Sequence, residues 1–418
     1  MQLTRRSHAR GALAGAALVA LSAVEARAEN ARFDTTHTVY TESPYRSRMT
    51  VYTPGADLQV TPFDALDVRA GWEADVVSGA SVAVKAGRAY QANNPSADVV
   101  TTASVHDFRN VGKGGFTLRN GEMSLTAGYA YGTEKDYRSH AINVAARTEL
   151  FEKNTQLEIA YARNFDSVCD RVQSANVTAP RARALEDSSG CFTSDPLRVQ
   201  HGIDLDGFQG SWSQAWTPIF ATQLVYSAEL VHGFQSNPYR SVILGQGLKA
   251  QEHHPENRAR NAVAARMNLF IRPIKAAIRL GARGYADTWD VWSITGEGEL
   301  EKYFGESLRL GLRGRYYNQT GALFWSDDYT GGDAPNGPKG QYFTGDRELS
   351  PFSSVAVGLR LTYTVTPGNG RLLGFMQGFK VGGSADAIQP TYREYTLGGA
   401  TITNARAYVL GLSAQASF

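Results

Sequence analysis

The feature that most constrains this chain is a two-residue alternation of apolar and polar side chains. In the segment 307–317, Leu308, Leu310 and Leu312 alternate with polar residues that include Arg309 and Arg313. The same split recurs in three other segments, 122–131, 156–165 and 354–363. Successive side chains of a strand point to opposite faces, so each segment predicts a strand with one apolar face. Helical periodicity is almost absent after the first thirty residues, and the sequence therefore predicts an all-β fold.

The amino-terminal residues have the order of a secretory signal peptide. Three arginines precede an apolar run over residues 11–24, and small residues follow it at positions 26 and 28. This run is shorter than the roughly 20 residues that a helix needs to cross a bilayer. We therefore expect residues 1–28 to be removed, so that the mature barrel spans residues 29–418. The paired arginines leave the twin-arginine export route open as an alternative.

The charge balance of the expected mature chain excludes a general affinity for nucleic acid. The signal segment holds four of the 42 basic residues and one of the 40 acidic residues, so the remainder is close to neutral. No later segment approaches the roughly 18 uninterrupted apolar residues of a transmembrane helix. If the chain enters a membrane, it must do so as a closed barrel, because only closure pairs every backbone group in hydrocarbon.

Short and long connections alternate along the predicted strands. The short ones fall at 62–64, 119–120, 151–153, 217–219, 272–274, 304–306 and 366–372. The long ones fall at 78–98, 168–203, 234–256, 321–349 and 389–403, with shorter links near residues 43, 134 and 289 on the same side. Short periplasmic turns and longer external loops are typical of outer-membrane barrels. The sequence predicts a transmembrane antiparallel up-and-down β-barrel of about 16 strands, with 14 as the alternative because segments 31–42 and 99–117 are the weakest strands.

The last segment is an alternating strand that ends on an aromatic residue. Tyr408, Leu410, Leu412 and Phe418 fall on one face. This pattern resembles the terminal strand by which Gram-negative outer-membrane proteins are recognised for assembly. We therefore expect location in the bacterial outer membrane, Phe418 as an assembly signal, and the barrel-assembly machinery and outer-membrane lipids as partners. Many Tyr and Trp residues lie near segment ends, as in the aromatic girdles at membrane interfaces.

The densest charge pattern runs through four successive predicted strands. The side chains expected to line the lumen are Arg258, Arg260, Arg266, Lys275, Arg279, Arg283, Glu297, Glu299, Glu301, Arg309, Arg313 and Arg315. One interpretation is a ladder of salt bridges that stiffens the wall. The other is that the surplus of arginine makes a basic wall that favours anionic solutes, as charged pore linings do.

The predicted hairpins also give the expected charge pairs. They are Glu301 with Arg309, Glu297 with Arg313, and Arg279 with Glu299. The first two follow from a hairpin folded about residue 305, and the third from one folded about residue 289. Opposed unlike charges stabilise a strand pair by roughly 0.2–1 kcal/mol each. Arg258, Arg260 and Arg266 are expected to have no acidic partner.

Two further groups of residues could carry chemistry. Cys169 and Cys191 are the two cysteines, and a secreted chain meets oxidising conditions, so a disulfide between them is expected. A metal pair is the alternative, but it lacks nearby histidines and CxxC spacing. His253 and His254 are weak candidates for metal ligands, because adjacent side chains in an extended loop point apart.

The sequence contains none of the local motifs of common hydrolases or nucleotide-binding enzymes. There is no G-x-S-x-G, no H-E-x-x-H and no phosphate-binding P-loop. We therefore expect neither an enzyme nor a cofactor. An outer-membrane hydrolase stays the least supported alternative, because catalytic residues on separate strands leave no local motif.

Three local patterns resemble a family of Gram-negative outer-membrane proteins known as the domain of unknown function three-five-seven-zero. They lie at Asp75–Ser81, at Glu134–Ser139, and between Asn154 and Asp166. The resemblance covers nearly the whole mature chain. It implies a barrel and gives no activity. It also suggests association with small lipoproteins, thioredoxin-like proteins and flavin transferases, as in an envelope redox or metal-handling system.

Two functions of different classes follow from these patterns. The preferred one is a porin-like channel for small solutes, with anions as the favoured class, because 16 strands usually enclose an aqueous lumen. A homotrimer is the expected assembly. The alternative is a barrel plugged by its own loops that anchors an envelope redox or metal-handling complex. Conductance in planar bilayers distinguishes the two.

Overall fold

The computed structural model describes most of the chain beyond the expected signal peptide. The described residues are 30–43, 49–79, 82–86, 99–101, 105–171, 192, 198–237, 241–243, 249–329, 336–367, 370–397, 400–402 and 405–418. The expected signal peptide, residues 1–28, lies outside them, and so does Cys191.

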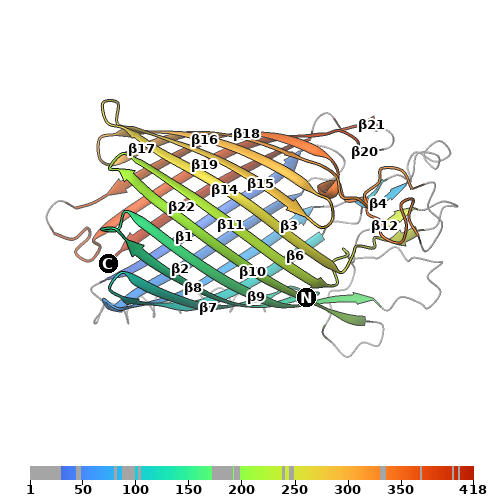
Figure 1. Cartoon of the computed structure of the whole chain (residues 1–418), viewed down its shortest axis with the longest axis horizontal. Helices are drawn as coiled ribbons and strands as arrows, with labels where there is room; N and C mark the ends of the chain where they lie inside the picture. Colours follow the sequence, from blue (N-terminus) through green and yellow to red (C-terminus); the bar gives the residue numbers. More distant parts are fainter. Residues whose placement is uncertain are drawn as a thin grey trace, which may run out of the picture.

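Sixteen antiparallel strands form one closed barrel (Figure 1). In order around the barrel they are β1 (Ala31–Ser43), β2 (Thr50–Phe63), β3 (Leu66–Gly79), β6 (Val105–Asn120), β7 (Met123–Thr133), β8 (Tyr137–Leu150), β9 (Thr155–Arg171), β10 (Arg198–Thr217), β11 (Phe220–Gly233), β14 (Asn257–Ile271), β15 (Ala276–Asp287), β16 (Trp292–Phe304), β17 (Leu308–Gln319), β18 (Phe352–Val365), β19 (Gly378–Tyr392) and β22 (Arg406–Ser417). Strand β22 pairs with both β19 and β1, which closes the barrel. The predicted sixteen-stranded up-and-down barrel is confirmed.

The two ends of the barrel differ as the turn pattern predicts. One end carries the tight turns and the carboxy terminus, and the other carries the long connections (Figure 1). Four short strands of these connections form a separate sheet: β4 (Val82–Ala86), β5 (Val99–Thr101), β12 (Ser241–Ile243) and β13 (Lys249–Gln251). Two more, β20 (Thr396–Leu397) and β21 (Ala400–Thr401), pair with each other.

The expected fourth strand over residues 99–117 is wrong in one respect. The structure divides it into β5 and β6, and β5 pairs with β4 instead of joining the barrel. The reason is that β3 ends at Gly79, opposite Val105, so the barrel offers no partner to residues that precede Val105.

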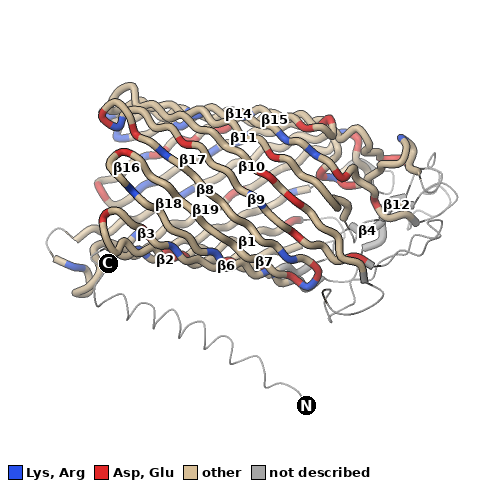
Figure 2. The backbone as a smooth tube through the Cα atoms, turned by 60° about the horizontal axis from the view of Figure 1, so that its bottom comes forward, with Lys and Arg blue, Asp and Glu red and all other residues tan. Residues whose placement is uncertain are grey.

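The outer surface of the barrel is an apolar belt. Outward side chains such as Ile159, Leu312 and Leu359 are more than half exposed, and comparable residues occur around the barrel from β2 to β22. Figure 2 marks the positions of Lys, Arg, Asp and Glu along the backbone, and many of them lie within the barrel strands. A closed sheet with an apolar exterior is the form in which strands cross hydrocarbon, because no backbone edge is left unpaired.

In the described part of the chain, no helix is long and apolar enough to cross a membrane.

On the outer surface of the barrel, some aromatic side chains bond to polar side chains on the neighbouring strand. The pairs are His37 with Tyr52, Tyr129 with His140, and Tyr226 with Asn261, all at 2.7–2.8 Å. Amphipathic rings are favoured at membrane–water interfaces.

The connections at the loop end pack into a cluster that we call the outer cap. It consists of residues 287–291 and the described parts of 320–351 and 392–402. Its apolar core is formed by Trp289, Val291, Ala322, Phe324, Trp325, Leu349, Tyr392, Tyr395 and Ile402. Nearby, Tyr329 is fully buried, and its hydroxyl donates to the backbone oxygen of Thr344. Arg347 ties the cap to β1, because its Nη2 lies 2.6 Å from Glu42 Oε1.

Candidate functional site

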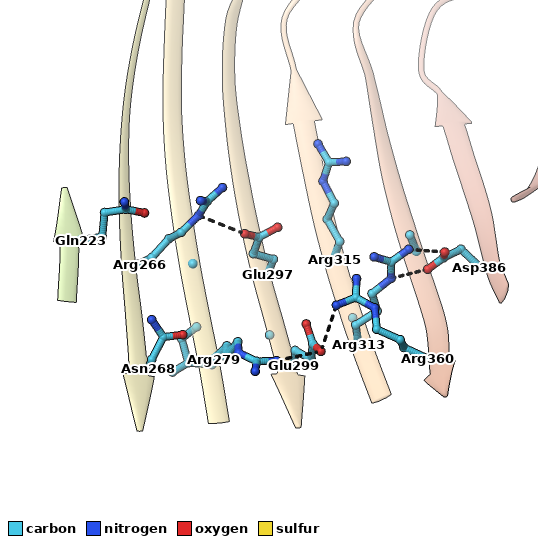
Figure 3. Close-up of a pocket in the computed structure, with 15 residues that line it drawn as sticks. Gln223, Arg266, Asn268, Arg279, Glu297, Glu299, Arg313, Arg315, Arg360 and Asp386 are labelled. Carbon is cyan, nitrogen blue, oxygen red and sulfur yellow. Dashed lines mark hydrogen bonds and ion pairs between the residues drawn. The ribbon is translucent and has the colours of Figure 1, made fainter. Parts of the chain in front are cut away.

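The inward face of β14 to β18 is a charged surface that we call the arginine wall. Its arginines are Arg258, Arg260, Arg266, Arg279, Arg283, Arg309, Arg313, Arg315 and Arg360, and its carboxylates are Asp287, Glu297, Glu299 and Glu301. Two cavities of about 560 Å³ each open on this wall. Figure 3 shows the first, which lies beside Arg266, Arg279, Arg313, Arg315 and Arg360. The second lies beside Arg258, Arg260 and Arg283.

The expected pair of Arg279 and Glu299 is present. The two residues are opposite each other in the β15–β16 register, and Arg279 Nη1 donates to Glu299 Oε1 at 3.1 Å. The same guanidinium donates to both carboxylate oxygens of Glu301 at 3.2 Å. Arg279 therefore holds two carboxylates of β16 at once.

The expected pairs across the β16–β17 hairpin are wrong. Glu301 is opposite Gly311, and Glu297 is opposite Arg315. Residues 305–307 form a three-residue turn that begins with Gly305 in the left-handed region, at φ 64°. The hairpin is therefore centred one residue later than expected, which shifts every partner on β17 by two residues.

The expectation that three arginines of β14 lack acidic partners is also wrong. Arg258 Nη2 lies 2.5 Å from Asp287 Oδ2, and Arg260 pairs with Glu229 on β11. Arg266 Nε lies 4.0 Å from a carboxylate oxygen of Glu297. The first two partners lie on the strands beside β14: Glu229 on β11 and Asp287 at the loop end of β15 are each opposite Arg260 in the register.

Lys275 does not belong to the wall. It lies in the turn between β14 and β15 at the short-turn end of the barrel, with its side chain exposed. Its backbone takes a left-handed conformation with φ 46°, and its N–H donates to the oxygen of Arg272 at 3.1 Å. The alternation that predicted an inward side chain does not extend to Lys275, because β15 begins one residue later, at Ala276.

Three ion pairs of the wall join strands that are not neighbours: Asp386 with Arg313, Glu297 with Arg266, and Glu299 with Arg360. Asp386 on β19 pairs with Arg313 on β17 across Gly358, which is opposite both of them on β18. A side chain at Gly358 would overlap the carboxylate of Asp386. The absence of a Cβ therefore opens the path between the two charged groups.

Glu297 uses the same arrangement on the other side of the wall. It is opposite Gly281 on β15, which in turn is opposite Arg266 on β14. Its carboxylate lies across Gly281, where an added Cβ would come within 2.7 Å of Glu297 Cγ and Oε1. Glu297 thus leans toward Arg266 and away from Arg315, its direct neighbour on β17 (Figure 3).

Three arginines of the wall form no ion pair with the described residues. The guanidinium of Arg283 lies 5.4 Å from the ring of Tyr285, and that of Arg315 lies 5.9 Å from the ring of Tyr317. Arg309 lies over the ring of Tyr303 at 5.1 Å. Arg283 and Arg315 are exposed to the lumen, whereas Arg309 is partly buried near the short turns.

The remaining predicted residues lie away from the wall. Cys169 is buried in β9, and because Cys191 lies outside the described residues, the disulfide stays a prediction. The backbone of Phe418 exchanges hydrogen bonds with Ala31, and its ring stacks on Phe375 at 6.0 Å. Phe418 therefore lies at the seam that closes the barrel.

The two histidines of the outer loop take different partners. His253 is exposed, with Nδ1 2.8 Å from the backbone oxygen of Gln341. His254 is buried, with Nδ1 3.1 Å from the oxygen of Gln235 and Nε2 3.7 Å from Glu252 Oε2. Among the residues that the structure describes, no group of three or more His, Cys, Asp or Glu could hold a metal ion.

Sequence reasoning missed four charged residues that complete the wall. They are Glu229, Asp287, Arg360 and Asp386. Arg360 lies on β18, and its ion pair with Glu299 on β16, at 3.6 Å, spans the strand β17 between them. Glu229, Arg360 and Asp386 lie on the polar faces of β11, β18 and β19, so the alternation of their segments predicts that they point into the lumen. Their ion-pair partners follow only from the register of the strands.

A family model described as "Protein of unknown function (DUF3570)" matches residues 7–376. The chain belongs to this family. The resemblance seen in the local patterns is thereby confirmed. No curated protein matches the sequence.

Several solved barrels are similar to the structure at low sequence identity. A bacterial polysaccharide outer membrane secretin gives a TM-score of 0.47 with 8% identity, covering 93% of this chain and 97% of the other. OccK2 (OpdF) of Pseudomonas aeruginosa, solved with glucuronate, gives 0.42 with 7% identity and coverages of 93% and 98%. CdiB from Acinetobacter baumannii gives 0.48 with 8% identity and coverages of 93% and 60%. We draw no functional inference from these similarities, because the identities are 7–8%.

Proposed function

We propose that this protein is an outer-membrane channel for small solutes and that its lumen favours anions. The observation that carries the proposal is the arginine wall, where nine arginines meet four carboxylates on the inward faces of five adjacent strands. Asp386 and Glu229 enter from the flanking strands and offset part of this excess. The lining is therefore net positive on this side of the lumen, and such a surface raises the local concentration of anions beside it.

The distribution of charge along the lumen supports a path through the barrel. The two cavities on the wall lie beside different parts of β14 and β15, one near Arg266 and Arg279 and the other near Arg258 and Arg283. Guanidinium groups therefore follow one another along the inside of the barrel. The charge of arginine does not depend on pH in the physiological range, so the preference for anions should be constant there.

Location in the outer membrane is part of the same proposal. It rests on the closed barrel, on its apolar outer belt and on the asymmetry between short turns and long connections. The short-turn end would face the periplasm, and the outer cap would face the exterior.

The test is electrophysiological. The protein without residues 1–28 is folded and inserted into planar lipid bilayers, and the reversal potential is measured in a potassium chloride gradient. We expect open-channel current with a reversal potential closer to the equilibrium potential of chloride than to that of potassium. The preference should fall as salt rises, because the Debye length shortens from about 10 Å at 0.1 M to about 3 Å at 1 M. Cation preference, or no current from correctly folded barrels, would overturn the proposal.

The second candidate is a membrane anchor whose lumen is closed by its own loops. The outer cap favours it, because the connections of the β15–β16, β17–β18 and β19–β22 pairs already pack into an apolar core at the loop end. Absence of current from folded barrels, together with copurification of envelope proteins, would support this candidate.

A further inference from the structure

We infer that Arg283 and Arg315 together form a binding site for a small dicarboxylate within the lumen. This inference rests on the proposed channel function and names the solute that its wall selects. The two residues are the lumen-exposed arginines of the wall that form no ion pair with the described residues.

The freedom of Arg315 is a consequence of its neighbours' geometry. Glu297 is directly opposite Arg315 but lies across Gly281 toward Arg266. Asp386 reaches across Gly358 and engages Arg313. Both nearby carboxylates are thus held by other arginines, and Figure 3 shows Arg315 extending toward the loop end of β17 without a contact to either.

Arg283 has a matching arrangement on β15. Its guanidinium lies over Tyr285, two residues closer to the loop end, just as Arg315 lies over Tyr317. A ring face attracts a guanidinium and limits its rotamers, while its N–H groups stay available to a ligand. The tyrosine hydroxyls are engaged elsewhere, with Asp287 at 2.6 Å and Gln319 at 2.5 Å.

The spacing of the two arginines fits a molecule with two anionic groups. Arg283 is opposite Thr295 on β16, and Thr295 is opposite Tyr317, two residues from Arg315. Strand spacings and the rise per residue therefore place the two Cα atoms roughly 12 Å apart. Each guanidinium can take one carboxylate in a two-pronged hydrogen bond. Arg315 lines one of the two cavities on the wall and Arg283 lines the other, and each cavity, of about 560 Å³, is large enough for a small organic anion.

The experiment compares block of the chloride current by succinate and by acetate at equal ionic strength. We expect succinate to block at a lower concentration than acetate, because it engages both arginines. Replacing either residue, as Arg283→Gln or Arg315→Gln, should raise the half-blocking concentration of succinate about tenfold, with acetate little affected. Neither substitution removes an ion pair, so conductance should be retained.

Arg69 provides the matched control. It lies on the inward face of β3, eight strands from β15 around the barrel, and forms no ion pair with the described residues. Arg69→Gln removes the same charge from the lumen and should leave succinate block unchanged. Equal block by acetate and succinate, or equal effects of all three substitutions, would overturn the dicarboxylate site while leaving the anion channel intact. Absence of current from the wild-type barrel would instead overturn the channel itself.

Discussion

Asp386 and Arg313 form an ion pair although a strand lies between them. The contact exists because Gly358, opposite both residues on β18, has no side chain to separate them. Asp57 and Lys113 meet in the same way across Gly71 on the other side of the barrel, at 3.0 Å. Charged groups of this lumen are thus connected over three strands at a time, and glycines decide which ones meet.

Replacing Gly358 with alanine should break the pair of Asp386 and Arg313. The new methyl group would occupy the position of the carboxylate, so we expect the free energy of unfolding to fall by about 1–3 kcal/mol. Urea unfolding, followed by the change in gel mobility on heating, measures the effect. Gly207→Ala is the control, because its nearest atom would be 3.8 Å away. Equal stability of the two variants would contradict the role of Gly358.

Replacing Asp386 with asparagine should strengthen the preference for anions. The carboxylate is 7% exposed and neutralises Arg313, which is 39% exposed to the lumen, so its removal frees one positive charge. The reversal potential in a potassium chloride gradient should move closer to the equilibrium potential of chloride. Asp64→Asn, in an exposed turn at the short-turn end, removes an equal charge and should have little effect. An unchanged potential in the Asp386 variant would show that Arg313 does not act on passing ions.

Replacing Gly281 with alanine should weaken binding at Arg315. The added methyl would press on Glu297 at 2.7 Å and turn its carboxylate back toward β17, where Arg315 is its direct neighbour. We expect weaker anion preference and weaker succinate block. Gly284→Ala, where an added Cβ meets no atom within 4 Å, serves as the control on the same strand. Identical block in the two variants would refute this account of why Arg315 is free.

Replacing Tyr329 with phenylalanine should loosen the outer cap without opening the barrel. The change removes the hydroxyl that donates to Thr344 and leaves a buried carbonyl without its partner, which costs about 1–3 kcal/mol locally. Burial raises the pKa of the Tyr329 phenol well above its ordinary value of 10, so this donor stays protonated at physiological pH. Faster hydrogen exchange in residues 336–349, with exchange in the strands unchanged, is the expected outcome. Unchanged exchange in that segment would mean that the hydroxyl does not hold the cap.

Cys169 and Cys191 should be resistant to alkylation in unreduced protein. A disulfide between them would close a loop of about 20 residues and restrict the unfolded chain by roughly 3 kcal/mol. Mass spectrometry after alkylation, with and without reduction, counts the reactive thiols. The alkylation is carried out in denaturant, because the buried Cys169 would resist labelling in the folded protein even as a free thiol. Labelling of Cys169 before reduction would contradict the pairing.

The wall shows where sequence reasoning reached its limit. Alternation placed Arg279 and Glu299 in the right strands, and the β15–β16 register confirms their pairing. The next hairpin failed, because a turn centred on residue 305 or on residue 306 fits the alternation equally well. Only the backbone of Gly305, which starts a three-residue turn, decides between them.

The sequence by itself determined the class of fold, the number of strands and which side chains are polar on each strand. Those properties depend on a period of two and on turn residues, both of which are local. The tertiary structure decided which charges meet, because each contact depends on the stagger of neighbouring strands and on glycines in strands between them. Glu297 shows the difference: its place on the polar face of its strand can be read from the chain, but its turn toward Arg266, which leaves Arg315 free, exists only once three strands lie side by side.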